Sequence, residues 1–230
     1  GRAAKPWMLR VQRDRLLDDM LAAFAPVASA KKLFSPTAVT FTSAFGEVED
    51  GDDRGGLTAE MYSLFWAHAL RPAAGLFESF RTPSGHALLL PAPLADAASL
   101  EAVGKLLLKC VLDDQPISGG LARVVLDFLV FGHEAPSLTE VGPALDALCD
   151  CDADLADAWR ALVDDPSALC SLAITFDAFD GGAAPAMADV PVSASNVFEA
   201  VLHGCRARLL GARRTAFEAL RRGFLSVEDL

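Results

Sequence analysis

The sequence has few basic residues for its many acidic ones. Lys and Arg number 20 against 31 Asp and Glu, which gives a formal net charge of -11. Nucleic-acid binding requires clustered Lys and Arg to neutralise phosphates, so no nucleic-acid partner is expected. One basic stripe occurs near the end of the chain: Arg206, Arg208, Arg213, Arg214, Arg221 and Arg222. We interpret it as a solvated helix face that pairs with the protein's own carboxylates.

Long apolar runs are also missing. The longest candidates, residues 33–46 and 166–176, fall short of the roughly 18 residues that a membrane-spanning helix requires, so no membrane span is expected. The sequence does not begin with Met or with a basic-then-apolar leader. We interpret this as an internal fragment of a longer protein rather than a secreted chain.

Cysteines are scarce and odd in number. The five are Cys110, Cys149, Cys151, Cys170 and Cys205. Most lie in apolar helical or strand patterns, which suits a reducing compartment better than a disulfide framework. We therefore expect an intracellular protein, in the cytoplasm or alternatively in the nucleus. Cys205 has basic neighbours that favour a thiolate, but its place in a helical apolar pattern favours a structural role.

Motifs for metals, cofactors and nucleophilic catalysis are absent as well. If the acidic run is read as a calcium loop from Asp50, Arg54 and Met61 fall at positions where oxygen ligands are needed. Cys149 and Cys151 lack the further soft or imidazole ligands that zinc requires. There is neither a Gly-x-Ser-x-Gly elbow nor a Gly-rich phosphate loop with a following Lys. We expect no metal site, no cofactor and no catalytic residue in this chain.

The most informative segment is residues 45–65, where an acidic loop runs into Gly55-Gly56 and then into a predicted helix over residues 57–70. Met61, Leu64, Phe65 and His68 fall on one face of that helix. Adjacent glycines permit positive φ or close backbone approach, so we expect them to permit a strand-to-helix turn. Glu60 is expected to satisfy neighbouring donors or a basic side chain in the core.

Hydrophobic periodicity predicts the other elements. Helical periods predict helices over residues 11–24, 97–112, 121–131, 197–210 and 217–224. Alternating patterns predict strands at residues 39–43 and 172–176, and an extended segment at 88–90. The sequence DGGAAP, residues 180–185, predicts a turn.

The balance of these patterns predicts an α+β, mainly helical fold. At 230 residues and 52% hydrophobic, the chain is long enough to bury a full core. Prolines and glycines give way to a dense acidic run after residue 134, which marks a candidate subdomain boundary. We expect a large helical subdomain, residues 1–136 and 191–230, and a smaller α/β subdomain inserted at residues 137–190.

Several motifs follow one another in a recognisable order. The most specific is the strand Val39-Thr40-Phe41, then Gly46-Glu47, then Asp53-Arg54-Gly55-Gly56-Leu57 and Glu60. Others are Val11 to Asp18, Gly75-Leu76-Phe77, Gly104-Lys105-Leu106-Leu107, Asp113-Asp114, Pro191 to Asn196 with Glu199, and Phe217 with Arg222-Gly223-Phe224. In this order the chain resembles the larger, N-terminal lobe of a HECT-type ubiquitin ligase domain, and the resemblance covers nearly all of it.

Two positions depart from the family pattern. Ala59 stands where the family usually has a basic residue before Glu60, so a contact of that base is lost. The Asp-Leu and Asp-Pro signature expected near residues 138–143 reads Leu-Thr-Glu-Val-Gly-Pro. The chain is thus similar to a divergent member of the family.

The resemblance implies a bilobal ligase, of which this chain is the lobe that docks a ubiquitin-conjugating enzyme. Ubiquitin would then pass to a Cys on a C-terminal lobe that this chain does not contain, and from there to a lysine of a protein substrate recruited by other regions. Docking would use residues 137–190, whose apolar candidates are Leu145, Leu148, Trp159, Leu162, Val163, Leu169 and Leu172. Trp159 is the preferred anchor, with a core position as the alternative. Asp150, Asp152, Asp154 and Asp157 would steer a basic partner.

The structural motif of this family would comprise Asp53, Gly55, Gly56, Glu60 and Asn196.

Two other classes of function stay open. A degenerate interaction module without ligase activity would explain the missing base at Ala59. A helical hydrolase would use Cys205 or a histidine, although no nucleophile, base and orienting group assemble from the sequence.

Overall fold

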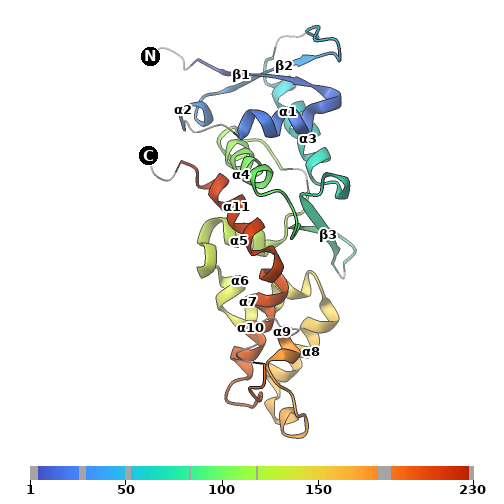
Figure 1. Cartoon of the computed structure of the whole chain (residues 1–230), viewed down its shortest axis with the longest axis vertical. Helices are drawn as coiled ribbons and strands as arrows, with labels where there is room; N and C mark the ends of the chain where they lie inside the picture. The colour runs from blue at the N-terminus through green and yellow to red at the C-terminus, as the bar shows by residue number, and fades with distance from the viewer. Residues whose placement is uncertain are drawn as a thin grey trace. The chain divides into compact units, whose positions relative to one another are not determined.

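The computed structural model describes residues 5–25, 30–49, 53–82, 84–117, 119–180 and 188–227 (Figure 1). These residues form a mainly helical α+β fold with two-stranded sheets, as the sequence predicts. Within the described part of the chain, no helix is long and apolar enough to cross a membrane.

The chain divides into two compact units. Unit 1 consists of Gly1–Phe77, Leu94–Gly119 and Glu218–Leu230, and unit 2 of Glu78–Pro93 and Gly120–Phe217. The segment 137–190, expected from the sequence to form the small subdomain, lies within unit 2.

Unit 1 begins with a parallel pair of strands, β1 (Trp7–Gln12) and β2 (Thr37–Thr42). Between them come the 3-10 turn η1 (Arg13–Arg15) and the helices α1 (Leu16–Phe24) and α2 (Ala30–Leu33), which supply the crossover that parallel strands need. Leu9 pairs with Val39 and Val11 with Phe41, and all of these side chains are buried.

The helix predicted from residue 11 was wrong at its start. Residues 7–12 alternate between buried and exposed side chains, which is the period of a strand, and α1 begins only at Leu16. Together with the residues that follow them, the apolar positions Leu9 and Val11 are compatible with a helical period as well as with a strand period. Pairing with β2, which is distant in sequence, selects the strand.

The other helices of unit 1 match their predictions closely. They are α3 (Gly56–Ala69) and α4 (Ala97–Leu112), with the 3-10 turn η2 (Pro72–Ala74) between them. The helix α11 (Arg214–Phe224) begins in unit 2, and its residues from Glu218 onward belong to unit 1. Within unit 1, α1 packs against α3 and α4.

The backbones of α4 and α11 meet at two glycines. A Cβ added to Gly104 would lie 2.1 Å from the carbonyl oxygen of Leu220, and one added to Gly223 would lie 1.9 Å from that of Glu101. No side chain fits at such distances, so glycine at both positions lets the two helices pack in backbone contact.

Unit 2 contains the sheet of β3 (Phe77–Arg81) and β4 (Ala87–Pro91), of which Phe77 is counted with unit 1, and most of the remaining helices. These are α5 (Arg123–Phe131), α6 (Pro136–Thr139), α7 (Val141–Cys149), α8 (Ala153–Asp164), α9 (Asp177–Asp180) and α10 (Val197–Leu209). The 3-10 turns are η3 (Gly132–Glu134), η4 (Pro166–Ser171) and η5 (Gly211–Arg213). Its apolar core contains Trp159, Phe176, Phe179 and Cys205, and α10 packs against α7, α8 and α9 around it.

The strand predicted at residues 172–176 is also wrong. Thr175 forms an isolated bridge with Pro191, and the flanking backbone bonds join Val192 N to Ile174 O and Phe176 N to Val190 O. The chain then turns into α9, so the alternation of apolar residues is too short to build a strand. Of the predicted DGGAAP turn, residues 181–185 lie outside the described residues.

Candidate functional site

The Asp53 carboxylate organises the junction between β2 and α3. Its Oδ2 accepts from Val39 N at 2.8 Å and from Thr58 Oγ1 at 2.5 Å, and its Oδ1 accepts from Gly55 N at 2.8 Å. Burial acts to raise the pKa of Asp53, but these hydrogen bonds outweigh it and hold the pKa below its ordinary value. The ionised form therefore stabilises the fold at neutral pH, and that contribution is lost as the pH falls through the lowered pKa.

The adjacent glycines have different roles at this junction. Gly55 adopts φ of 99° in the left-handed region as the residue before the helix, whereas Gly56 is the first helical residue. Space is open around both Cα atoms. Only Gly55 is therefore required by the backbone conformation.

We expect Gly55→Ala to lower the free energy of unfolding by about 1–2 kcal/mol, because an L side chain is strained in the left-handed region. Gly56→Ala, its neighbour in a helical conformation, should be neutral or stabilising by up to about 1 kcal/mol. Urea unfolding of both variants measures the difference. Equal losses at the two positions would contradict this explanation of the pair.

Glu60 binds a basic side chain, as expected, but not in the core. It pairs with Arg13 Nη1 at 2.6 Å, while Arg13 Nε bonds both carboxylate oxygens of Glu49 at 3.1 Å. The hydrogen bonds that Arg13 donates to Glu60, and then those to Glu49, raise the pKa of Arg13. The guanidinium also stacks over Phe41, 4.0 Å from the ring centroid. Both Glu60 and Arg13 are partly exposed, so the pair itself contributes little stability.

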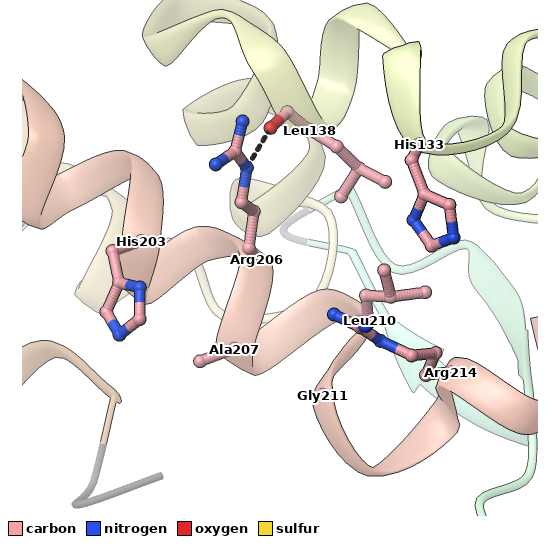
Figure 2. Close-up of a pocket in the computed structure, with 8 residues that line it drawn as sticks. All are labelled: His133, Leu138, His203, Arg206, Ala207, Leu210, Gly211 and Arg214. Atoms are coloured by element: carbon pink, nitrogen blue, oxygen red, sulfur yellow. Dashed lines mark hydrogen bonds between the residues drawn. The ribbon is translucent and has the colours of Figure 1, made fainter. Parts of the chain in front are cut away.

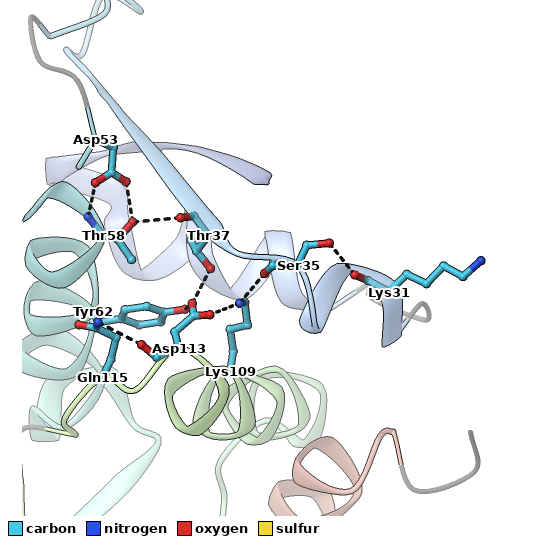
Figure 3. Close-up of polar contacts among 9 residues, drawn as sticks. All are labelled: Lys31, Ser35, Thr37, Asp53, Thr58, Tyr62, Lys109, Asp113 and Gln115. Carbon is cyan, nitrogen blue, oxygen red and sulfur yellow. Dashed lines mark hydrogen bonds and ion pairs between the residues drawn. The ribbon is translucent and has the colours of Figure 1, made fainter. Parts of the chain in front are cut away.

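A partly buried polar network lies beside this junction (Figure 3). Asp113 Oδ2 accepts from Thr37 Oγ1 at 2.6 Å and from the Tyr62 hydroxyl at 2.8 Å, and Asp113 Oδ1 is paired with Lys109. Lys109 is 1% exposed and also donates to Ser35 O at 2.8 Å. Burial raises the pKa of Tyr62, which keeps the phenol neutral. A hollow of about 450 Å³ opens next to the network, but the carboxylate oxygens are already occupied. We therefore assign the network a structural role.

Most of the predicted docking residues lie in the core of unit 2. Leu145, Leu148, Trp159 and Leu169 are buried, and Leu162 and Val163 are partly buried against the same cluster. Trp159 is 5% exposed and packs on Phe179 with ring centroids 5.2 Å apart. The preference for Trp159 as an exposed anchor was therefore wrong, and the core alternative holds.

Among the described residues of this segment, two large apolar side chains are well exposed. Leu172 is 45% exposed, and Val190, which the sequence argument missed, is 38% exposed. Ile174, between them in the chain, is partly buried, and its carbonyl accepts from Val192 N at 2.8 Å. Leu172 is thus the one predicted anchor that the described residues leave well exposed.

Several acidic residues of the segment have local partners. Asp152 Oδ1 accepts from Leu155 N at 3.1 Å as the N-cap of α8. Asp157 and Asp146 both pair with Arg160 at 3.0 Å. Burial, and then the charge of Asp146, raise the pKa of Asp150. Asp154 is exposed in the first turn of α8.

Asn196 holds the turn that precedes α10. Its Oδ1 accepts from Ser193 N at 2.7 Å, and its Nδ2 donates to Pro191 O at 3.0 Å. The residue therefore fixes the backbone at the end of the Pro191–Asn196 motif.

A pocket of about 650 Å³ in unit 2 has several basic side chains in its lining, and we call it the Arg/His pocket (Figure 2). Its lining residues are His133, Leu138, His203, Arg206, Ala207, Leu210, Gly211 and Arg214. The sequence singled out Arg206 and Arg214 as part of a basic stripe, but not the histidines. Other members of the stripe pair with carboxylates, as predicted: Arg213 with Glu78, and Arg222 with Glu101 at 3.5 Å.

The thiols that the structure describes are poorly suited to catalysis. Burial raises the pKa of Cys110 and of Cys205 to about 12, and that of Cys151 to about 11. Cys110 is in addition a hydrogen-bond partner of Trp66 Nε1 at 3.4 Å. No group of three or more metal-ligating side chains occurs among residues whose positions are described.

Cys110 and Cys205 should therefore resist alkylation in the folded protein. A pKa raised from 9.0 to about 12 lowers the thiolate fraction about a thousandfold, and burial hinders access further. Mass spectrometry after a timed iodoacetamide reaction at pH 8 measures each site, with the denatured protein as control. Labelling of Cys205 at the denatured rate would contradict the assignment and reopen the hydrolase hypothesis.

No protein-family model matches this sequence, and no curated protein matches it significantly.

Proposed function

We propose that this chain is a HECT-like lobe that recruits a ubiquitin-conjugating enzyme, so that ubiquitin passes to a cysteine outside this chain and then to a substrate lysine. The observation that carries the proposal is the ordered series of family motifs from Asp53 to Phe224. Some residues of these motifs have a defined structural role here. Asp53 and Gly55 build the strand-to-helix junction, Gly104 and Gly223 permit the helix contact, and Asn196 holds a turn.

Docking through residues 137–190 requires exposed apolar side chains with a polar rim. Leu172 and Val190 meet the first requirement. Asp154 and Asp157, both exposed on α8, provide negative charge in the same segment for a basic partner surface. We therefore place the contact on Leu172 and Val190 rather than on Trp159.

Calorimetric titration of the chain with a panel of ubiquitin-conjugating enzymes tests this proposal. We expect weak binding to at least one of them, and Leu172→Asp to weaken it about tenfold or more by placing a charge in an apolar contact. Leu94→Asp is the matched control, because Leu94 is 98% exposed and lies in unit 1. Absence of binding across the panel would overturn the proposed recruitment.

We propose that the chain itself forms no thioester with ubiquitin, because the resemblance places the accepting cysteine outside it. Burial also raises the pKa of Cys110, Cys151 and Cys205, which disfavours a thiolate at those three positions. Incubation with a ubiquitin-loaded conjugating enzyme, followed by electrophoresis with and without reducing agent, checks this. A ubiquitin adduct on this chain that reducing agent removes would contradict it.

The alternative hypothesis, a degenerate interaction module without ligase activity, depends on the missing basic residue at Ala59. Glu60 nevertheless has a basic partner in Arg13, 2.6 Å away. The substitution at position 59 therefore gives no specific reason to prefer a module without ligase function.

A further inference from the structure

The Arg/His pocket differs in charge from the protein that contains it. The whole chain carries a formal net charge of -11, yet the lining includes two arginines and two histidines, and none of the lining residues is acidic. A hollow of this composition attracts anions and repels cations.

Two of these side chains are held in place by neighbours. Arg206 Nε donates to the backbone oxygen of Leu138, and its two terminal nitrogens form no hydrogen bond or ion pair with a described residue. His203 Nε2 lies 2.8 Å from Oδ2 of Asp180, whose carboxylate is buried. This carboxylate orients the imidazole and leaves Nδ1 for another partner. Donors fixed in this way lose little conformational freedom when a ligand binds.

Arg214 supplies the second guanidinium. It is exposed at the start of α11, and within the described parts of the chain no hydrogen bond or ion pair to it is found. Figure 2 shows Leu138 and Leu210 in the middle of the group, with His203 and Arg206 on one side and His133 and Arg214 on the other. His133 packs edge-on against Phe128, with ring centroids 5.2 Å apart.

We propose that the Arg/His pocket binds a phosphate monoester. A phosphate monoester carries nearly two negative charges and three acceptor oxygens, which suits two guanidinium groups supported by imidazoles better than a singly charged carboxylate does. The buried side chains of Leu138 and Leu210 give the pocket an apolar floor for the group that carries the phosphate. A volume of about 650 Å³ lies in the range of small-molecule sites.

Titration of the full chain with phenyl phosphate, benzoate and a phosphoserine peptide, followed by NMR of the arginine and histidine side chains, tests the proposal. Phenyl phosphate should bind more tightly than benzoate and shift the signals of Arg206 and Arg214. If the phosphoserine peptide binds at least about tenfold more tightly than phenyl phosphate, the natural ligand is a phosphorylated protein side chain. If the two bind equally tightly, the natural ligand is a small metabolite. Either result supports the site. Benzoate binding as tight as that of phenyl phosphate would overturn the phosphate assignment.

Arg206→Gln and Arg214→Gln should each weaken phenyl phosphate binding about tenfold, and the double variant should abolish it, because each substitution removes a charge-assisted donor. Arg208→Gln is the matched control: Arg208 is exposed on α10 but does not line this pocket. Unchanged binding in the double variant, or no binding of phenyl phosphate at millimolar concentration, would overturn the proposal.

The outcome is independent of the proposed ligase function. Arg206 and Arg214 lie outside residues 137–190, where docking of the conjugating enzyme is placed. Failure of either binding experiment leaves the other intact.

Discussion

Gly223→Ala should lower the free energy of unfolding by about 3 kcal/mol or more, the largest loss that we expect from a single methyl group in this chain. The new Cβ would lie 1.9 Å from the carbonyl oxygen of Glu101 and 3.0 Å from Cα of Gly104. Both are backbone atoms of α4, so the clash is relieved only if one helix moves. The helical preference of Ala over Gly, about 1 kcal/mol, is too small to compensate.

Gly142→Ala is the control for this substitution. Gly142 is also helical, in α7, but a Cβ there meets nothing within 4 Å. We expect its stability to be unchanged or to rise by up to about 1 kcal/mol. Urea denaturation followed by circular dichroism compares the variants. A Gly223→Ala protein as stable as Gly142→Ala would show that α4 and α11 do not pack in backbone contact.

Asp113→Asn should cost about 3 kcal/mol, because it leaves the ammonium of Lys109 buried without its countercharge. Lys109 is 1% exposed, and the carboxylate also accepts from Thr37 and Tyr62. The side chain keeps its shape in this variant, so a loss of stability reports the charge and its hydrogen bonds rather than a cavity. Thermal and urea unfolding measure it.

Asp114→Asn is the adjacent control. Asp114 is exposed and has φ of 53°, a conformation that Asn tolerates, so little change is expected. Adding Lys109→Met to Asp113→Asn should recover part of the loss, because the uncompensated charge is removed with its partner. A double variant less stable than the sum of the two single changes would contradict this explanation.

Hydrophobic periodicity predicted the two long helices of unit 1, α3 and α4. The helix predicted over residues 97–112 is observed with the same bounds, and the Asp96 side chain caps it by accepting from Ser99 N at 2.8 Å. Strand β1 was missed because its partner, β2, lies about 30 residues away in sequence. The strand predicted at residues 172–176 has the apolar alternation of a strand but lacks a pairing segment long enough to form one. Only Thr175 forms a bridge, with Pro191.

The docking residues were harder to predict because helical spacing identifies an apolar face without saying what covers it. Trp159 on α8 has the period of an exposed anchor and of a core residue alike, and α10 covers it: a Cβ at Gly204 would lie 2.6 Å from the Trp159 ring. Leu172 stays exposed after η4. Tertiary packing, which no single-helix pattern contains, makes this distinction.

Only some residues of the Arg/His pocket could be predicted from the sequence. The basic stripe contained Arg206 and Arg214, but His133 lies far from them in sequence and comes from η3. Arg213, next to Arg214, turns instead to Glu78 and to the ring of Phe80. In the folded chain, the arginines of the basic stripe therefore have different roles: some form ion pairs with carboxylates and others line the pocket.

Residues 137–190 are proposed to recruit a ubiquitin-conjugating enzyme, and NMR mapping of the bound surface is the decisive test. The isotope-labelled chain is titrated with unlabelled conjugating enzymes, and backbone amide shifts are followed. The proposal predicts perturbations concentrated around Leu172 and Val190 that Leu172→Asp suppresses. Perturbations confined to unit 1, or none with any enzyme, would contradict it.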